Sequence, residues 1–329
     1  MKTVLIDYLS PGGHLPIINF YIKNLGKCFD LIYLNNKVRK NILAKNKINY
    51  INLKKNFFLR FFQMLGFFLS LKKKNINRVV MLSYEPQILF FLSFFIDLSY
   101  FKIFVFEHDT LNEKNYFKFL FIKYLNKNIT HLAYTDTQIK LLNKIFKKKA
   151  IFTNHPIIEN KKNINHIKKK KFKKKIILIP TRHHFIKDLI ENFIKKNLNY
   201  QFYVLAKKNN LKKKIFSNFN NVKLIEFIKE KDINKVIAIY LPLDPEIYKY
   251  RVSAWLYMGI AYNKKILMEN NDLYKFEKKR FPNYIVLNNN KIFNNFNSFV
   301  KKKINISKYN SLLITNLKKS IFGKIKIDN

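Results

Sequence analysis

The sequence MKTVLIDYLSPGGHLPIINFYIKNL (residues 1–25) decides the fold class, because it combines three local signals in a fixed order. Thr3–Ile6 is a continuous apolar run, which is typical of a buried strand. Gly12 and Gly13 predict a turn, and Leu15–Leu25 then carries apolar residues at helical spacing. A buried strand followed by a turn and a helix favours a parallel α/β sheet.

The same alternation of strand and helix continues along the chain and is interrupted once. Residues 159–175 are dominated by Lys, Asn and Ile, and such a run of like charge resists packing. We therefore expect two doubly wound α/β domains: an N-terminal Rossmann-like domain over residues 1–158, a basic linker over 159–175 and a C-terminal Rossmann-like domain over 176–329. The further strands expected are 30–34, 78–82, 101–106, 131–134, 150–153, 176–180, 201–205, 222–226, 238–241 and 265–268, with helices over 137–146, 187–196 and 251–262.

The charge of the chain is strongly positive. It has 64 Lys and Arg against 20 Asp and Glu, a formal net charge of +44. Such a field favours polyanionic partners, namely nucleic acid, an anionic membrane leaflet or phosphorylated substrates. Overuse of Lys, Asn, Ile and Phe throughout the chain also fits compositional drift of an A+T-rich coding sequence, so charge alone leaves both explanations open. No nucleic-acid module is visible and the lysines occupy both halves, so we expect no specific nucleic-acid partner.

Cysteine and histidine limit the chemistry. Cys28 is the single cysteine, which excludes an internal disulfide and a cysteine-built zinc site and fits a reducing cytoplasm. The seven histidines are scattered without a paired spacing, so we expect no metal site.

Two apolar segments raise the question of a membrane. Residues 57–71 are shorter than the roughly 20 needed to span a bilayer, and residues 88–106 contain Asp97 and Lys102. Neither predicts a transmembrane helix, and the first residues give no secretory signal. The segment 57–71, flanked by lysines, fits either a basic aromatic helix in the membrane interface or a buried helix of the N-terminal domain.

Ligands in doubly wound sheets bind beyond the carboxyl ends of the strands, so the loops there hold the candidate residues. Gly12 and Gly13 fit either a tight turn or a backbone anion site, although the full dinucleotide fingerprint and the P-loop are both absent. Glu107, His108 and Asp109 follow a hydrophobic strand, where general bases are often found. Asp109 with Thr110 also fits a helix cap.

Two further loops contain positively charged side chains that are candidate ligands of a phosphate. Arg182 and Lys187 lie five residues apart after the first strand of the second half, where both can reach a diphosphate. Arginine is rare in this lysine-rich chain, which favours a specific role for Arg182. Arg251 and Ser253 open a predicted helix and fit a phosphate site or, alternatively, a capped helix with a surface arginine.

The order of these pieces resembles GT-B glycosyltransferases, which use nucleotide sugars to build bacterial surface polysaccharides. The resemblance lies in the strand before Gly12-Gly13, in residues 134–137 and 153–157, in Thr181-Arg182 with Lys187, in residues 221–224, and in the helix and strand over residues 251–267. It covers nearly the whole chain with loose motifs. It implies two Rossmann-like domains facing a central cleft.

The resemblance also implies a function. We expect transfer of a sugar from a nucleoside-diphosphate donor to a lipid-linked or polysaccharide acceptor of the cell envelope, in the cytoplasm at the inner face of an anionic membrane. No metal or cofactor is expected, because the nucleotide sugar is a substrate. The implied site residues are Arg182, Lys187, Glu246, Arg251 and Ser253 for the donor, Gly12, Gly13 and His14 for the acceptor or a phosphate, and His108, Asp109 or Glu107 as base.

One departure from the family leaves the stereochemistry open. Tyr250 and Met258 stand where many retaining members carry two glutamates, and Glu246 is the candidate to replace one of them. Three other functions fit parts of the same sequence: a nucleotide-sugar 2-epimerase of the same fold, a GT-B-like protein without catalytic activity, and a polyanion-binding protein.

Overall fold

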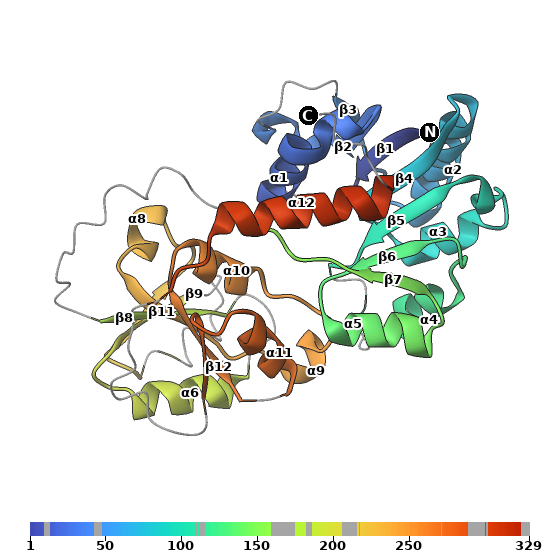
Figure 1. Ribbon diagram of the computed structural model, residues 1–329. Coiled ribbons are helices and arrows are strands. Elements are labelled where there is room, and N and C mark those ends of the chain that lie inside the picture. The colour runs from blue at the N-terminus through green and yellow to red at the C-terminus, as the bar shows by residue number, and fades with distance from the viewer. Residues whose placement is uncertain are drawn as a thin grey trace. The chain divides into compact units, whose positions relative to one another are not determined.

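The computed structural model of the chain forms two compact α/β units. Unit 1 comprises Met1–Pro156, Tyr250–Val252 and Asn310–Asn329, and unit 2 comprises Ile157–Lys249 and Ser253–Tyr309. Each unit is built on its own sheet (Figure 1). The structure describes residues 1–9, 14–42, 48–108, 111, 116–158, 175–181, 186–205, 216, 218–270, 272–288, 300 and 302–323.

The sheet of unit 1 has seven described strands, all paired in parallel in the order β3-β2-β1-β4-β5-β6-β7. The direction of the strand order reverses between β1 and β4, which is the switch point where doubly wound sheets bind ligands. Its strands are β1 Lys2–Asp7, β2 Leu31–Asn35, β3 Ile48–Ile51, β4 Ile76–Ser83, β5 Lys102–Phe106, β6 Thr130–Ala133 and β7 Lys149–Phe152.

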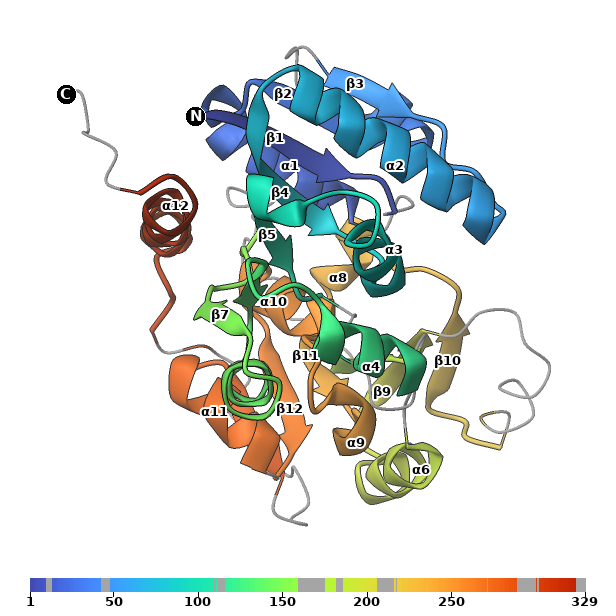
Figure 2. The ribbon, with the colours of Figure 1, turned by 90° about the vertical axis from the view of Figure 1, so that its right-hand side faces the viewer.

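The central strands of unit 1, β1, β4 and β5, are mostly apolar because helices cover the sheet. Val4, Val79 and Ile103 are almost fully buried and belong to one core cluster with side chains of the helices that follow β3, β4 and β5. Figure 2 shows α2, α3 and α4 in succession beside this sheet. The helices of unit 1 are α1 Leu15–Leu25, α2 Phe57–Lys73, α3 Pro86–Leu92, α4 Tyr116–Tyr124 and α5 Asp136–Lys140, the last continued by a π-helical turn over Leu141–Ile145.

Unit 2 repeats the doubly wound topology with six described parallel strands in the order β10-β9-β8-β11-β12-β13. Its switch point lies between β8 and β11. Its strands are β8 Ile176–Pro180, β9 Gln201–Leu205, β10 Val222–Ile225, β11 Val236–Leu241, β12 Lys265–Glu269 and β13 Ile285–Asn288. Its helices are α6 Lys187–Lys196, α8 Glu230–Ile233, α9 Pro245–Tyr248, α10 Ala254–Ala261 and α11 Asp272–Arg280.

The last helix, α12 (Ile306–Phe322), begins among the residues of unit 2 and ends among those of unit 1. Its final residue Phe322 packs 5.7 Å from the ring of Phe29, measured between centroids, and lies 5.4 Å from the guanidinium carbon of Arg78. The sequence analysis did not predict this return of the chain to the first unit.

The structure confirms the predicted class of two doubly wound α/β domains, and each strand expected from the sequence is present within about one or two residues. The edge strands β3 and β13 were not predicted. The helix expected over residues 251–262 starts only at Ala254, because Tyr250–Val252 belongs to unit 1 as a non-helical segment. Among the described residues, no helix is long and apolar enough to cross a membrane.

Candidate functional site

At the switch point of unit 1 the ends of β1 and β4 are joined by side chains. The hydroxyl of Ser83 donates to a carboxylate oxygen of Asp7, and the same hydroxyl accepts from the backbone N–H of Leu9 at 3.2 Å. Asn35 at the end of β2 donates to the carbonyl of Tyr8 at 2.6 Å. The carboxyl ends of three neighbouring strands are therefore fixed relative to one another.

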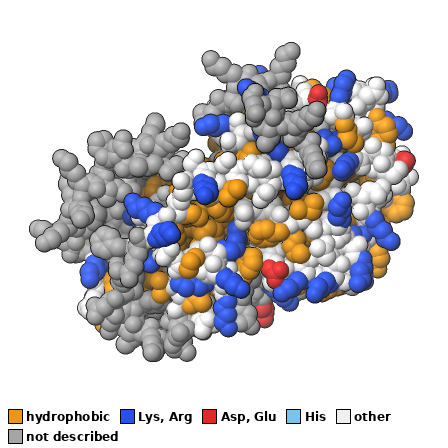
Figure 3. All heavy atoms as spheres, in the orientation of Figure 1, with side chains coloured by type: hydrophobic (Ala, Val, Ile, Leu, Met, Phe, Trp, Pro, Cys, Tyr) orange, Lys and Arg blue, Asp and Glu red, His pale blue; other side chains and the backbone are white. Residues whose placement is uncertain are grey.

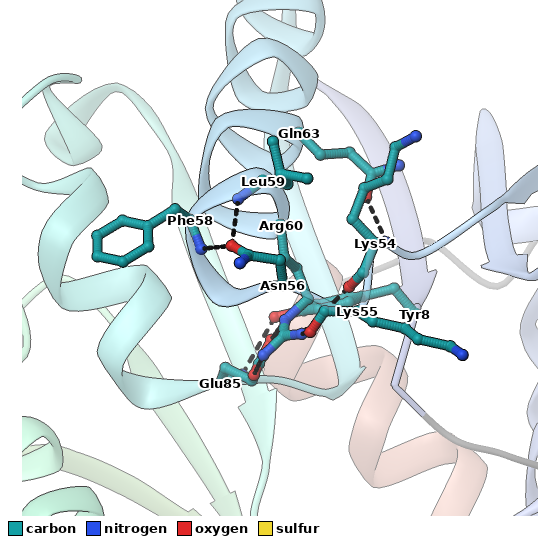
Figure 4. A network of polar contacts seen from close by, with 9 residues as sticks. All are labelled: Tyr8, Lys54, Lys55, Asn56, Phe58, Leu59, Arg60, Gln63 and Glu85. Carbon is teal, nitrogen blue, oxygen red and sulfur yellow. Dashed lines mark hydrogen bonds and ion pairs between the residues drawn. The ribbon is translucent and has the colours of Figure 1, made fainter.

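Near this switch point, an ion pair joins α2 to the residue before α3 (Figure 4). Arg60 of α2 makes a two-point contact with Glu85, with both N–O distances at 2.6 Å. The same guanidinium donates to the carbonyls of Lys54 and Lys55 at 3.2 and 3.0 Å. The backbone N–H of Glu85 donates to the hydroxyl of Tyr8, and burial raises the pKa of that hydroxyl far above its ordinary value. These contacts fix the start of α3.

His108, the predicted base, lies in the loop after β5. Its imidazole lies close to the side-chain rings of one tyrosine and two other histidines. Its Nε2 lies 3.2 Å from the hydroxyl of Tyr134. The ring of His14 lies 5.1 Å away, and that of His155 lies 6.2 Å away. Three histidines that follow three different strands therefore converge, a feature that their scattered spacing in the sequence did not reveal. Among the described residues, no group of His, Cys, Asp and Glu is arranged to hold a metal ion.

His108 is held in its neutral form. Burial lowers its pKa well below the ordinary value of 6.5, and the nearby imidazoles of His14 and His155 lower it further. A neutral imidazole can act as a general base, and Nε2 of His108, which contacts the Tyr134 hydroxyl, is the nitrogen that can take up the proton.

Glu107 stands beside His108 in the sequence, but its side chain points into the protein. It has no exposed surface, and its Oε1 accepts from the Tyr84 hydroxyl at 2.5 Å and contacts Nδ1 of His131 at 2.6 Å. Gln138 donates to the carbonyl of Glu107 at 2.9 Å. These contacts favour a positioning role, in which Glu107 fixes the loop that carries His108. Asp109, Gly12 and Gly13 lie outside the described residues, whereas His14 is the residue before α1.

The same Gln138 connects this loop to a distant stretch of chain. Its amide donates at 2.9 Å to the carbonyl of Tyr250, whose side chain is buried in the unit 1 core. Arg251 follows in the same non-helical segment and is half-buried. Arg251 therefore does not open helix α10. Ser253 directly precedes α10 but makes no side-chain capping bond, and its side chain is buried.

In unit 2 the described part of the switch point is formed by the start of α6 and the end of β11. The backbone N–H of Ile186 donates to the carbonyl of Pro242 at 3.4 Å. Lys187 opens α6 and lies 3.4 Å from the carboxylate of Glu191, with about half of its side chain exposed. Arg182, the other predicted diphosphate ligand, lies outside the described residues.

Two carboxylates lie beyond the ends of β11 and β12. Glu246 is exposed in the first turn of α9, where its backbone N–H donates to Asp244 at 3.0 Å. Glu269 ends β12 and accepts from the hydroxyl of Tyr240 at 2.5 Å. Sequence reasoning did not select Glu269, although a carboxylate at the end of an apolar strand is the available signal. The structure gives no contact between Glu246 and the other predicted donor residues in the described part of unit 2.

Comparisons with known proteins identify the fold. No protein-family model and no curated protein sequence matches the chain. Among solved structures, a glycosyltransferase from Rickettsia africae is 16% identical over 98% of this chain and 91% of its own, with a TM-score of 0.60. S. aureus MnaA, solved with UDP, is 12% identical over 98% of both chains, with a TM-score of 0.61.

A third structure, the lipopolysaccharide outer core galactosyltransferase WaaB, is 14% identical over 99% of this chain and 92% of its own, with a TM-score of 0.55. Several UDP-GlcNAc 2-epimerases match over similar lengths, including one from Methanocaldococcus jannaschii at 12% identity, 95% and 99% coverage and a TM-score of 0.56. At such identities the likeness concerns the fold. The chain has the GT-B fold, which glycosyltransferases and UDP-GlcNAc 2-epimerases share.

Proposed function

We propose that this protein is a metal-independent glycosyltransferase of the hexosyltransferase type. It would move a sugar from a nucleoside-diphosphate donor to a lipid-linked or polysaccharide acceptor of the cell envelope, at the inner face of the cytoplasmic membrane. The solved structures that match nearly the whole chain support a sugar-nucleotide enzyme, because one holds UDP and others are named galactosyltransferase or UDP-GlcNAc 2-epimerase.

The contacts of the unit 1 carboxylates and the neutral His108 favour sugar transfer over epimerisation. The carboxylates described at the switch-point end of the unit 1 sheet are engaged with internal partners: Asp7 with Ser83, Glu85 with Arg60, and Glu107 with Tyr84 and His131. His108 is neutral, and its Nε2 faces a hydroxyl. A neutral imidazole suits removal of a proton from an attacking acceptor hydroxyl.

In the proposed reaction, the acceptor hydroxyl loses its proton to Nε2 of His108 as its oxygen attacks the anomeric carbon of the donor. The bond from that carbon to the diphosphate oxygen breaks, and the nucleoside diphosphate leaves with the electron pair. Arg182, Lys187 and Arg251 would stabilise its charge. Gly12, Gly13 and His14 would contact the acceptor or a phosphate, and Glu246 and Ser253 would contact the donor.

The second candidate is epimerisation of a nucleotide sugar, favoured by the epimerases among the matching structures. A product assay separates the two functions. The protein is incubated with UDP-, GDP-, ADP- and CMP-sugars, with and without a cell-envelope extract that contains lipid-linked saccharides. We expect one donor to release its nucleotide and pass labelled sugar to the extract. Formation of a C2 epimer without any extract would identify an epimerase, and no turnover of any donor would leave a GT-B-like binding protein.

A further inference from the structure

Two consecutive helices of unit 1, α2 and α3, and the residues after α3 expose large apolar side chains that a globular enzyme normally buries. On α2, Phe58 is 69% exposed and Phe62 is 61% exposed. Just after α3, Phe94 and Phe95 are 68% and 64% exposed. Contiguous apolar surface of this kind on a soluble domain usually marks an interaction site.

Ring contacts between α2 and the α3 region occur at two places among these side chains. The ring of Phe61 lies 5.4 Å from that of Phe62 and 5.5 Å from that of Phe95, which connects α2 with the residues after α3. Phe57 likewise lies between Phe58, at 5.8 Å, and Phe91, at 6.3 Å. We name this surface the aromatic ridge and define it by six exposed residues: Phe58, Leu59, Phe62, Phe91, Phe94 and Phe95.

The inner face of α2 is already used by the protein core. Phe61, Met64 and Phe68 are buried against the unit 1 sheet, so the helix is apolar on both its inner and its outer sides. The outer side combines exposed Phe and Leu with flanking lysines, a composition that fits a helix lying in the interface of a bilayer.

Positive charge surrounds the aromatic ridge. The sequence from Lys54 to Lys74 contains five lysines, and α4 adds Lys123. Arg60 in the same stretch is paired with Glu85, and the exposed Asp97 lies two residues after Phe95, so lysines outnumber the acidic side chains near the ridge. Figure 3 shows that blue Lys and Arg side chains outnumber red Asp and Glu side chains on the face of the molecule in view. Lysine is depleted at the core of protein–protein interfaces, whereas lysine next to Phe and Leu is typical of helices that lie on anionic membranes.

We propose that the aromatic ridge inserts into the surface of an anionic lipid bilayer, with Lys54, Lys55 and Lys72–Lys74 contacting the lipid headgroups. The occupant is the lipid surface itself. Only the role of this surface, which is to bring the enzyme to a lipid-linked acceptor, rests on the proposed function. Its test uses the full-length protein without any donor, so it can fail or succeed independently of sugar transfer.

The test is flotation with vesicles of neutral phosphatidylcholine alone or mixed with anionic phosphatidylglycerol. We expect binding to the anionic vesicles that weakens as salt rises, because added salt screens the lysines. The double variants Phe58→Ser/Phe62→Ser and Phe94→Ser/Phe95→Ser should each lower the partition coefficient at least tenfold. The variant Lys72→Gln/Lys73→Gln/Lys74→Gln should lower it on anionic vesicles only.

Matched controls come from unit 2, where Leu198 and Phe227 are 69% and 59% exposed outside the aromatic ridge. The double variant Leu198→Ser/Phe227→Ser should bind vesicles like the wild type. Circular dichroism should show that all variants are folded, since each replaced side chain is exposed. Equal loss in the control and ridge variants, or no vesicle binding by the wild type, would overturn the proposal. So would ridge variants that convert a dimer into a monomer while vesicle binding stays unchanged.

Discussion

Replacement of His108 by glutamine is expected to lower kcat/KM for sugar transfer by about 10²- to 10⁴-fold, the usual contribution of a general base. The affinity for the nucleotide should stay unchanged, because His108 is proposed to act on the acceptor hydroxyl, whereas Arg182, Lys187 and Arg251 are the proposed ligands of the nucleotide. Glutamine keeps a polar side chain of similar size but cannot take up the proton. The measurement is release of nucleoside diphosphate from the donor in the presence of the accepting extract.

His155→Gln is the matched control, because it removes an imidazole of the same cluster, 6.2 Å from His108. We expect a loss below tenfold for this variant. If the two variants lose activity equally, the cluster supports the structure and His108 is not the base.

The pH profile of the wild type should agree with this assignment. A base with a depressed pKa is neutral, and thus active, at every pH above that pKa. kcat/KM should therefore stay level as the pH falls through 6.5 and should decrease only below it. A decrease that begins above pH 7 would contradict the assignment.

Replacement of Glu107 by alanine is expected to destabilise unit 1 by about 3 kcal/mol, because it leaves two buried partners, Tyr84 and His131, without their shared acceptor. The loop that carries His108 should lose its position at the same time. Urea unfolding followed by circular dichroism measures the first effect, and the transfer assay measures the second.

Two conservative variants check the cause of this loss. Glu107→Gln keeps an oxygen that can accept from Tyr84, so it should cost less stability than the alanine variant. Tyr84→Phe removes one donor and should cost about 1 kcal/mol. Should Glu107→Ala be as stable as the wild type while transfer is lost, Glu107 would itself take part in the chemistry.

The sheets were predictable from the sequence because parallel strands buried on both faces form uninterrupted apolar runs, such as Ile176–Pro180. The edge strand Ile48–Ile51 was not, since its alternation of half-buried and exposed residues resembles the surrounding Asn- and Lys-rich chain. The boundary of α10 was misplaced for another reason. Residues 250–252 have helix-compatible identities, but the carbonyl of Tyr250 accepts a hydrogen bond from Gln138, more than a hundred positions earlier in the chain, which no local pattern reveals.

The candidate site was predictable only in part. His108 could be selected because it follows an apolar strand, but its neighbours His14 and His155 come from loops after other strands, and only the strand order brings them together. For the same reason Glu107 could not be distinguished from a catalytic carboxylate before its buried contacts were known.

The chain has only six arginines, and several of them occupy specific positions. Arg60 makes a two-point ion pair with Glu85, and Arg280 contacts Glu277 and the hydroxyl of Tyr257. A planar guanidinium offers contacts that lysine cannot replace. Both of these arginines have structural partners, and the role predicted for Arg182, outside the described residues, stays a prediction.

The most direct test of the proposed function is a thermal-shift panel with UDP, GDP, ADP, CMP and CDP on the wild type and on Arg182→Ala. A nucleotide at 100 times its dissociation constant should stabilise the wild type by about 2.7 kcal/mol. Loss of a charged contact should weaken binding by about 1.5–3 kcal/mol, so the same nucleotide should stabilise the variant by only about 0.3–1.3 kcal/mol. We predict that one nucleoside diphosphate behaves in this way. If none stabilises the wild type while DNA or anionic vesicles do, the protein is a polyanion-binding protein with a GT-B fold.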